Sequence, residues 1–401
     1  MTNIIYLDNN ATTKVDERVA EKMLPYFCKY YGNPSSMHDF GGNVKHAVDE
    51  ARAQIAEFMG ANTEREIIFT GSGSESANLA VKGVLEAKKG RKHIITTRVE
   101  HACVLNQYKL LEKEGYVVDY IDVLPSGELD LSKLESMVND DTALVSCMMA
   151  NNETGVIFPV DKVAQIVKKK NHRTKVFVDA VQAAGKIKLD VKNTEIDMMS
   201  ISGHKFHAPK GVGALYIKAG TLISPLIIGG HQEKGKRAGT EAVPSLVGFG
   251  YAAQLAQENL EYEATEVKKM RDALEQNIIK SVYNARINTN TDFRVPNTTN
   301  IGFQFIEGEL ILLHLSELGI CASSGSACTS GSLEPSHVLK AQGIPFSALH
   351  GSIRFSLSRF NTMKEIDEVS SVLPKVIEKL NNISPFQKEL KDLRAKSLIV
   401  R

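Results

Sequence analysis

Between residues 60 and 217, short runs rich in β-branched and aromatic residues alternate with longer segments of helical periodicity. The short runs predict seven strands, in the segments REIIFTG, KHIITT, YVVDYIDV, TALVSCMMA, KVFVDA, DMMSIS and GALYIK. Helices are predicted in SESANLAVKGVLEAKK, ACVLNQYKLLEKEG and PVDKVAQIVKKK. Such alternation indicates an α/β fold with a mainly parallel sheet covered by helices on both faces. Ligands of these sheets bind at the carboxyl ends of the strands, so the loops that follow the strands should carry the chemistry.

The pattern changes after about residue 260. EATEVKKMRDALEQNIIKSV predicts one long helix, and shorter strands and helices follow in NTTNIGFQF, GELILLHLSELG, SIRFSLS and MKEIDEVSSVLPKVIEKL. We therefore expect a large α/β domain over residues 13–259 and a smaller α+β domain made of residues 1–12 and 260–401. The final segment, 387–401, is charged and is predicted to be a loosely held tail.

Composition narrows the class of protein. The chain has 401 residues, 43% of them hydrophobic, and a net charge of +1. That balance is typical of a globular protein of two or three domains and gives no large field for attracting nucleic acid or an anionic membrane. The start, MTNIIYLDNNATTK, lacks the basic and apolar parts of a signal peptide, and no apolar run could span a bilayer, so a cytoplasmic protein is expected.

The five cysteines are odd in number and form no C-x-x-C pair, which argues against a disulfide framework and a structural zinc site. Cys147 is expected in a buried strand, and Cys28 and Cys321 are expected to be structural. Cys328 differs because serine and glycine surround it in ASSGSACTSGSLEPSH. Such a composition predicts a solvated loop, and a thiol there is either incidental or meant to be reached.

A lysine and a carboxylate follow two of the predicted strands. Lys205 lies between a strand and a Gly/Pro turn, where desolvation can lower its pKa and make the amine a nucleophile. Lysine Schiff bases form in this way with pyridoxal phosphate (PLP), whose ring nitrogen needs an acidic partner, and Asp179 could supply it. Alternatively, Lys205 is a solvated loop lysine and Asp179 caps a helix. His204 and His207 have no carboxylate or thiol nearby at metal-ligand spacing.

The segment GSGSES, residues 71–76, follows one strand and opens a helix. Glycines let the backbone approach a ligand, and the N–H groups at a helix N-terminus bind phosphate, to which Ser74 can add a hydroxyl. The spacing is neither the dinucleotide fingerprint nor a P-loop, so it indicates phosphate binding without a dinucleotide. A plain helix cap is the alternative.

Three further side chains suit a polar substrate. His101 lies in a strand-to-helix loop, where an imidazole can transfer protons or stack on a flat cofactor. Asn151 and Asn152 lie in another such loop and could orient a polar group. Arg354 carries a planar fork that fits a carboxylate. Each also has a purely structural alternative, but together they suit a phosphorylated aldehyde cofactor and an amino-acid substrate.

An ordered set of motifs then resembles a known family. The motifs are YLDNNATT, YGNPSS, EHACV, NNETG, VDAVQ, SGHKFHAPKG, RAGTEAV, SSGSACTSGSLEPSH and IRFSLSRF. In that order they resemble the cysteine desulfurases, fold-type I PLP enzymes, along essentially the whole chain. GHQEKGKRAGTE, KFHAPKG and SGSLEPSHV most resemble the nitrogen-fixation (NifS) type, which supplies sulfur for iron–sulfur clusters.

The resemblance implies a set of site residues. Those around the cofactor would be Gly73, Ser74, His101, Asn152, Asp179, Gln182, Ser202, His204, Lys205 and Thr240. Lys205 would attach the cofactor, Asp179 would pair with the ring nitrogen, and Gln182 with the ring hydroxyl oxygen. His101 would stack on the ring and transfer protons. The phosphate would be held by Ser74, Ser202 and His204, and by Thr240 from the other subunit of a homodimer.

The resemblance also implies the substrate and the acceptor. Asn152 and Arg354 would hold the carboxylate of L-cysteine, and Cys328 would take its sulfur as a persulfide while alanine leaves. The sulfur would pass to an iron–sulfur scaffold of the NifU type. No resident metal is implied, although a transient iron–sulfur ligand role for Cys328 stays open. With no basic residue near Cys328 in sequence, His101 is expected to accept its proton.

Two positions depart from the family pattern. The phosphate loop reads Gly71-Ser72-Gly73-Ser74-Glu75 where Ser-Gly-Ala-Thr-Glu is usual, which keeps the hydroxyl. Cys103 stands where alanine is usual, and we predict that this extra thiol is not catalytic. The rival functions are a selenocysteine lyase, an aminotransferase or another fold-type I PLP enzyme, and a non-catalytic sulfur carrier or cluster scaffold.

Overall fold

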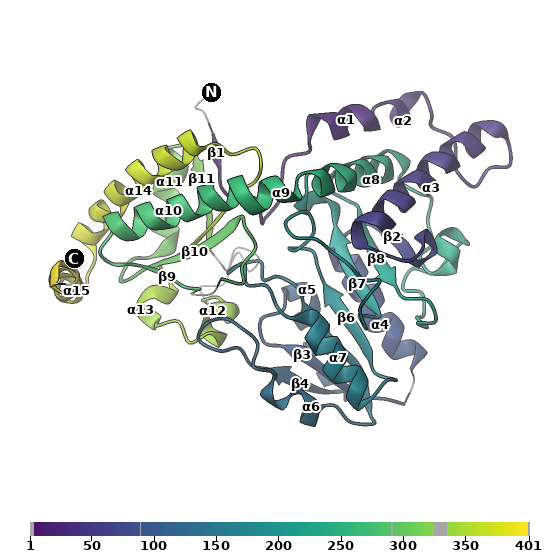
Figure 1. Ribbon diagram of the computed structural model, residues 1–401, viewed down its shortest axis with the longest axis horizontal. Coiled ribbons are helices and arrows are strands. Elements are labelled where there is room, and N and C mark those ends of the chain that lie inside the picture. Colours follow the sequence, from purple (N-terminus) through teal and green to yellow (C-terminus); the bar gives the residue numbers. More distant parts are fainter. Residues whose placement is uncertain (1–3, 89, 290–291, 325–334, 400–401) are drawn as a thin grey trace.

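A computed structural model describes residues 4–88, 90–289, 292–324 and 335–399. Two lobes lie side by side, each with its own sheet, and a run of helices crosses from one lobe to the other (Figure 1). The larger lobe holds a seven-stranded sheet and the smaller lobe a four-stranded one. A separate pair of short strands, β1 (Ile5–Tyr6) and β11 (Ile320–Cys321), joins the N-terminal segment to the smaller lobe.

The large sheet has the strand order β2-β8-β7-β6-β5-β3-β4. Its strands are β2 (Ile67–Thr70), β3 (His93–Thr97), β4 (Val117–Ile121), β5 (Thr142–Met148), β6 (Lys175–Asp179), β7 (Met198–Ser202) and β8 (Gly213–Ile217). Strand β8 runs antiparallel to both of its neighbours, and every other pairing is parallel. The predicted seven strands and the mainly parallel sheet are confirmed.

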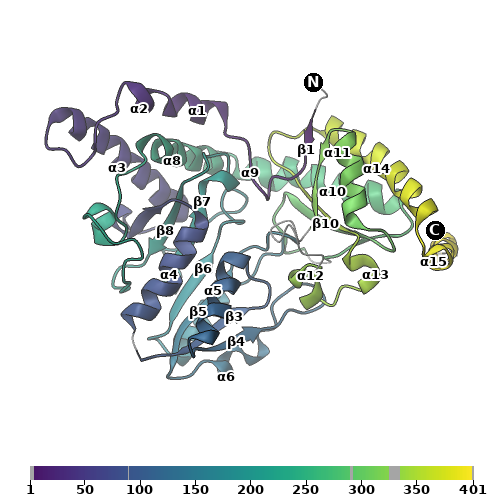
Figure 2. The same cartoon turned by 180° about the vertical axis from the view of Figure 1, so that it is seen from behind.

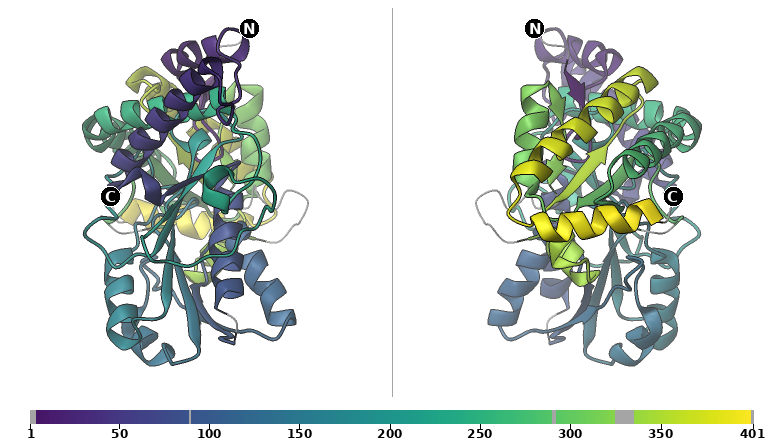
Figure 3. Two further views of the ribbon diagram at one scale, coloured as in Figure 1. Left: turned by 90° about the vertical axis from the view of Figure 1, so that its right-hand side faces the viewer. Right: turned by 90° about the vertical axis from the view of Figure 1, so that its left-hand side faces the viewer.

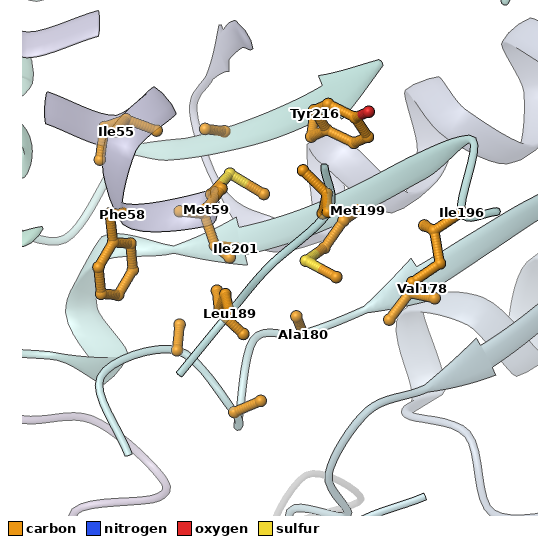
Figure 4. Close-up of a cluster of buried hydrophobic side chains, with 14 of the residues drawn as sticks. Ile55, Phe58, Met59, Val178, Ala180, Leu189, Ile196, Met199, Ile201 and Tyr216 are labelled. Carbon is orange, nitrogen blue, oxygen red and sulfur yellow. The ribbon is translucent and has the colours of Figure 1, made fainter. Parts of the chain in front are cut away.

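Helices cover both faces of this sheet, as expected for a mainly parallel sheet whose strands are mostly buried (Figure 3). Helices α3 (Asp39–Met59), α7 (Val160–Lys170) and α8 (Val243–Glu258) cover one face, and α4 (Gly73–Ala87) and α5 (Ala102–Lys113) cover the other. Successive strand residues alternate between the two cores, with Val145 in the first and Leu144 in the second. In the first core, Ile55 and Met59 of α3 face Ile201 and Met199 of β7 (Figure 4).

The helices that were not predicted include four of the larger lobe: α1 (Glu17–Met23), α2 (Pro25–Cys28), α3 and α8. Helices α3 and α8 pack against each other over the sheet, and buried residues lie along most of α8. A helix buried all round has no polar stripe to reveal its period. Its glycines also suggest breaks in a helix, but they serve helix packing. A Cβ at Gly250 would lie only 2.7 Å from the Ala51 Cα, so glycine here permits the close approach of α3.

The smaller lobe has the strand order β12-β13-β10-β9, all antiparallel. These strands are β9 (Ala285–Ile287), β10 (Thr298–Phe303), β12 (Ser323–Ser324) and β13 (Ser352–Ser356). Helices α10 (Lys268–Ser281), α11 (Gly308–Glu317) and α14 (Met363–Ile383) pack with them into one core, which also takes in Ile5 and Leu7 (Figure 2). The predicted long helix after residue 260 begins with α9 (Leu260–Tyr262) and a π-helical turn, Glu263–Val267, before α10.

The charged C-terminal segment forms a helix, α15 (Gln387–Ile399), so the predicted loose tail is wrong for these residues. Leu390 is 2% exposed and anchors the helix, while the Gln387 amide donates to the Asn381 and Ser384 carbonyls. One buried leucine among charges gives little periodic signal. The remaining short helices are α6 (Leu134–Met137), α12 (His337–Ala341) and α13 (Phe346–Leu349).

The proposed domain limits, 13–259 against 1–12 with 260–401, stay a prediction. The two cores of the larger lobe are distinct from the main core of the smaller lobe, and Val267 of the π-helical turn already belongs to the latter. No helix within the described ranges is long and apolar enough to cross a bilayer.

Candidate active site

One cavity lies at the carboxyl ends of β2, β3, β5, β6 and β7, where the sequence placed the chemistry. The predicted residues that line it are Gly73, Ser74, His101, Asn152, Asp179, Gln182, Ser202, His204 and Lys205. Its volume is about 220 Å³, several times the ~30 Å³ share of one water molecule in the liquid. A small organic molecule with a single ring therefore fits. Met148, Ala150 and Val181 add apolar walls.

Lys205 ends a single 3₁₀ turn, Gly203–Lys205, that follows β7 directly. Its Nζ donates to the carbonyl of Asn10 at 2.6 Å and to that of Ala11 at 2.8 Å. His207, two residues on, has a φ of 69° and is held by hydrogen bonds to Thr13 and Lys14. A non-glycine residue in this region is uncommon, so the surrounding contacts fix the path of the lysine turn.

Asp179 is the last residue of β6 and is 5% exposed. Burial raises the pKa of its carboxyl above the ordinary value. Both of its hydrogen bonds, from the Val181 amide at 2.9 Å and the Ser200 hydroxyl at 3.3 Å, end on Oδ1. A buried carboxylate beside a cavity is stabilised by a cationic group placed in that cavity.

The helix that follows β2 supplies a built anion cradle. Ser72 caps α4, its hydroxyl accepting from the Glu75 amide, and Gly73 and Ser74 form the first turn. The backbone approaches closely here, because a Cβ on Gly73 would lie 2.8 Å from Val181 Cγ2 and 3.2 Å from Ser202 Cβ. The Ser202 hydroxyl is buried with no hydrogen-bond partner among the described residues. An anion at this N-terminus would satisfy it.

A salt bridge holds this cradle in place. The Glu75 carboxylate accepts from Arg237 Nε at 2.8 Å and from the Gly71 amide at 2.8 Å. The loop therefore has a fixed path despite its two glycines, which the sequence alone did not reveal.

The two histidines have different surroundings. His101 is the N-cap of α5, and its Nδ1 accepts from the Cys103 amide at 3.2 Å. The neutral ring therefore carries its proton on Nε2. Burial, with Lys205 and Lys210 nearby, lowers the pKa of His204 to about 4, so this ring is neutral at pH 7. Its Nδ1 lies 3.1 Å from the Thr12 hydroxyl.

Arg354 of β13, in the smaller lobe, does not itself line the cavity but contacts Asn152, which does. Its Nη1 donates to the Asn152 carbonyl at 3.0 Å and its Nη2 to Asp8 at 2.7 Å, while Nε is buried without a partner among the described residues. The Asn152 side chain lines the cavity. A substrate carboxylate would have to share this guanidinium with Asp8.

The neighbouring loop residues are structural. Asn151 is fully buried, donating to the Val99 carbonyl and accepting from the Glu153 and Thr154 amides, so it shapes the loop and does not orient a substrate. Glu153 is 3% exposed and accepts from the Ser336 hydroxyl, the N-cap of α12, at 2.5 Å.

Asn10 is a central residue that the sequence analysis assigned no role, although it lies in YLDNNATT. Its carbonyl accepts from both Lys205 and Gln182, the latter at 2.9 Å. Its side chain donates to the Asn152 carbonyl and to Thr298 of β10. A buried Asn-Asn pair just after an apolar strand was the available signal.

Other predicted residues lie elsewhere. Thr240 is exposed and lies outside the cavity of its own chain. Cys328 lies outside the described residues. Cys147 is buried in β5, as predicted, whereas Cys28 is exposed at the end of α2, contrary to the expected structural role. Cys103 lines the cavity, and burial raises the pKa of its thiol.

Comparison with known proteins places this geometry in a family. The pattern of the aminotransferase class-V family matches residues 5–369. Cysteine desulfurase 2 of Trichormus variabilis is 54% identical, covering 97% of both chains. The cysteine desulfurase NifS of Azotobacter vinelandii is 50% identical over 95% of this chain and 94% of its own. A solved NifS-like protein, 41% identical, superposes with a TM-score of 0.89 over 94% of this chain and all of its own.

The chain belongs to the class-V aminotransferase family. The resemblance to cysteine desulfurases that the motifs carried is confirmed, and so is the fold class. The cavity lies where class-V aminotransferases, like other α/β proteins, are expected to bind ligands, at the carboxyl ends of the strands.

Proposed function

We propose that the protein is a PLP-dependent cysteine desulfurase that converts L-cysteine to L-alanine and retains the sulfur on Cys328. The observation that carries the proposal is that one cavity is lined by Lys205, Asp179 and Ser202, whose buried hydroxyl has no partner in the described part of the chain. The similarity to cysteine desulfurases over nearly the full length supports it.

The residues present fit PLP group by group. The N-terminus of α4, with Gly73, Ser74 and Ser202, suits a phosphate. Asp179 suits a protonated ring nitrogen, and Lys205 offers the amine that an aldehyde needs. The cavity lining thus offers a partner for each of these groups of one small molecule. When bound, PLP withdraws electrons from the substrate carbon that carries the amino group.

The chain's own residues divide the remaining work. Asp179 is buried and acceptor-only when ionised, so it holds a proton on the ring nitrogen. His101 lines the cavity and would stack on the ring and exchange a proton through Nε2. Asn152 and Arg354 orient the substrate carboxylate.

The sulfur transfer balances without an outside oxidant or reductant. The Cys328 thiolate attacks the substrate sulfur, the carbon–sulfur bond breaks and a sulfur–sulfur bond forms. The carbon takes up a proton, so one cysteine becomes one alanine and one persulfide.

The finer assignments belong to the same proposal. We propose a cytoplasmic homodimer, with Thr240 completing the phosphate site of the other subunit, and a NifU-type scaffold as sulfur acceptor in cluster assembly for nitrogen fixation. Their support is the sequence resemblance and, for Thr240, its exposure.

The test is the mass of the peptide that contains Cys328 after L-cysteine is added to the reduced, PLP-loaded protein, with alanine measured in the same tube. We expect one added sulfur on Cys328 together with alanine. Cys103→Ala is the matched control for a cavity thiol and Cys28→Ser for an exposed one, and both should keep the activity. Alanine without sulfur on Cys328, or loss of activity in Cys103→Ala, would contradict the assignment.

A further inference from the structure

A second lysine lies buried behind the cavity. Lys186 is 6% exposed and sits four residues after Gln182 in the turn that follows β6. Its Nζ lies 3.5 Å from Gln182 Oε1, within hydrogen-bonding range but long. A small second cavity is lined by Lys186 and Lys205 and also by Glu263 of the π-helical turn.

The two neighbours of Gln182 determine which way its amide lies. In its charged form Lys186 only donates hydrogen bonds, and the end of the amide that then faces it, at 3.5 Å, is the oxygen. The Asn10 carbonyl only accepts, so the end that faces it, at 2.9 Å, must be the nitrogen. The amide nitrogen has a second hydrogen, which remains for the cavity that Gln182 lines. Reversing the amide would put NH₂ against the ammonium and oxygen against the carbonyl.

A glutamate of the smaller lobe acts electrostatically on Lys186. Glu263 is 4% exposed, and its attraction favours the charged form of Lys186, although burial lowers the pKa of the lysine and raises that of the glutamate. Lys205 and Arg354 act in the opposite sense, because their positive charges repel the charged form of Lys186. Such a buried charge is costly to keep unless it serves an arrangement of its neighbours.

We propose that Lys186 is a positioning residue, which fixes the amide of Gln182 so that it presents an N–H donor to the cofactor cavity. This inference rests on the proposed function and deepens it. Lys186 would fix the orientation of the N–H donor that would meet the ring oxygen of PLP. Without Lys186, only the Asn10 carbonyl would oppose reversal of the amide, and a reversed amide would present an acceptor to an oxygen that carries negative charge.

The test is a double-mutant cycle on the PLP-loaded enzyme, using wild type, Lys186→Met, Gln182→Leu and the double variant. The measurement is the pH midpoint of the change in visible absorption of the cofactor attached to Lys205. Loss of a donor to the ring oxygen, and loss of a nearby positive charge, both raise this midpoint. We expect Lys186→Met to raise it by a fraction of a pH unit to about one unit, since a neutral hydrogen bond is worth ~1 kcal/mol.

In the Gln182→Leu background the same substitution should shift the midpoint by less than half as much. Equal shifts in the two backgrounds would overturn the proposal, because Lys186 would then act by charge alone. Lys188→Met is the matched control, because Lys188 is an exposed lysine two residues further along the chain, and it should leave the midpoint unchanged.

If Lys186→Met leaves the buried Glu263 without an opposing charge and fails to fold, the cycle is run in a Glu263→Gln background. The charges of Lys186 and Glu263 are then removed together. A wild-type protein with no visible cofactor band would refute the proposed function, whereas a normal band with equal shifts refutes only the role of Lys186.

Discussion

Glu153 should make the stability of the protein fall as pH rises through the neutral range. Its carboxyl is buried, with the Ser336 hydroxyl at 2.5 Å, and burial raises its pKa from 4.5 to about 7. The folded chain therefore binds one proton more than the unfolded chain between these two values. The contribution is fully present below about pH 4.5 and is lost by about pH 7. At about 1.4 kcal/mol per pH unit, the loss is about 3 kcal/mol.

The assay is urea unfolding of wild type and Glu153→Gln at several pH values from 5 to 8. Glutamine keeps the oxygen that accepts from Ser336 but does not ionise. Relative to wild type, we expect the free energy of unfolding of the variant to increase by about 2.5 kcal/mol from pH 5 to pH 8, because part of the wild-type loss has already occurred at pH 5. Glu57→Gln, at an exposed position of α3, should stay parallel to wild type. Parallel curves for Glu153→Gln would refute the raised pKa and the reasoning from burial.

Three further changes test the cradle and the C-terminal helix. Ser202→Ala removes the buried hydroxyl that has no partner among the described residues. A hydrogen bond to a charged group is worth about 1.5–3 kcal/mol, so PLP should bind about ten- to a hundredfold more weakly in a titration. Unchanged affinity would mean that the phosphate binds elsewhere. Gly73→Ala puts a Cβ 2.8 Å from Val181 and should lower PLP occupancy after reconstitution, without lowering alanine production per bound PLP if the cradle serves binding alone. Leu390→Ala should destabilise the docking of α15 by about 2 kcal/mol or more and expose it to limited proteolysis, whereas protection equal to wild type would mean that Leu390 does not anchor it.

The large sheet could be predicted because its strands and covering helices have different periods. Helix α8 could not, because it is apolar on nearly every side and contains Gly248 and Gly250, which a sequence pattern reads as breaks. In the fold they let α8 approach its neighbours, with a Cβ on Gly248 only 2.6 Å from Met23 Sδ. That function depends on the partner helix, which local sequence does not show.

The residues of the site likewise fall into those that the sequence predicts and those that it does not. Lys205, Asp179 and His101 were visible because each follows a predicted strand, and parallel strands bring such loops to one edge. The neighbours that fix their geometry were not visible: Asn10 acts through its backbone carbonyl, which every residue has, and Arg237 reaches Glu75 across 162 positions. The resemblance to a family named the role of Gln182, but not the lysine that lies behind it.

The amine of Lys205 is held by main-chain oxygens, those of Asn10 and Ala11. Substitution at either position changes a side chain but leaves both oxygens in place, so point mutation cannot delete these acceptors. Only a change in the path of the chain can, such as an insertion or deletion before residue 10. Over evolutionary time this part of the site should therefore tolerate changes of residue type better than changes of length, and length variants of the N-terminal segment should be the ones that lose the lysine's position.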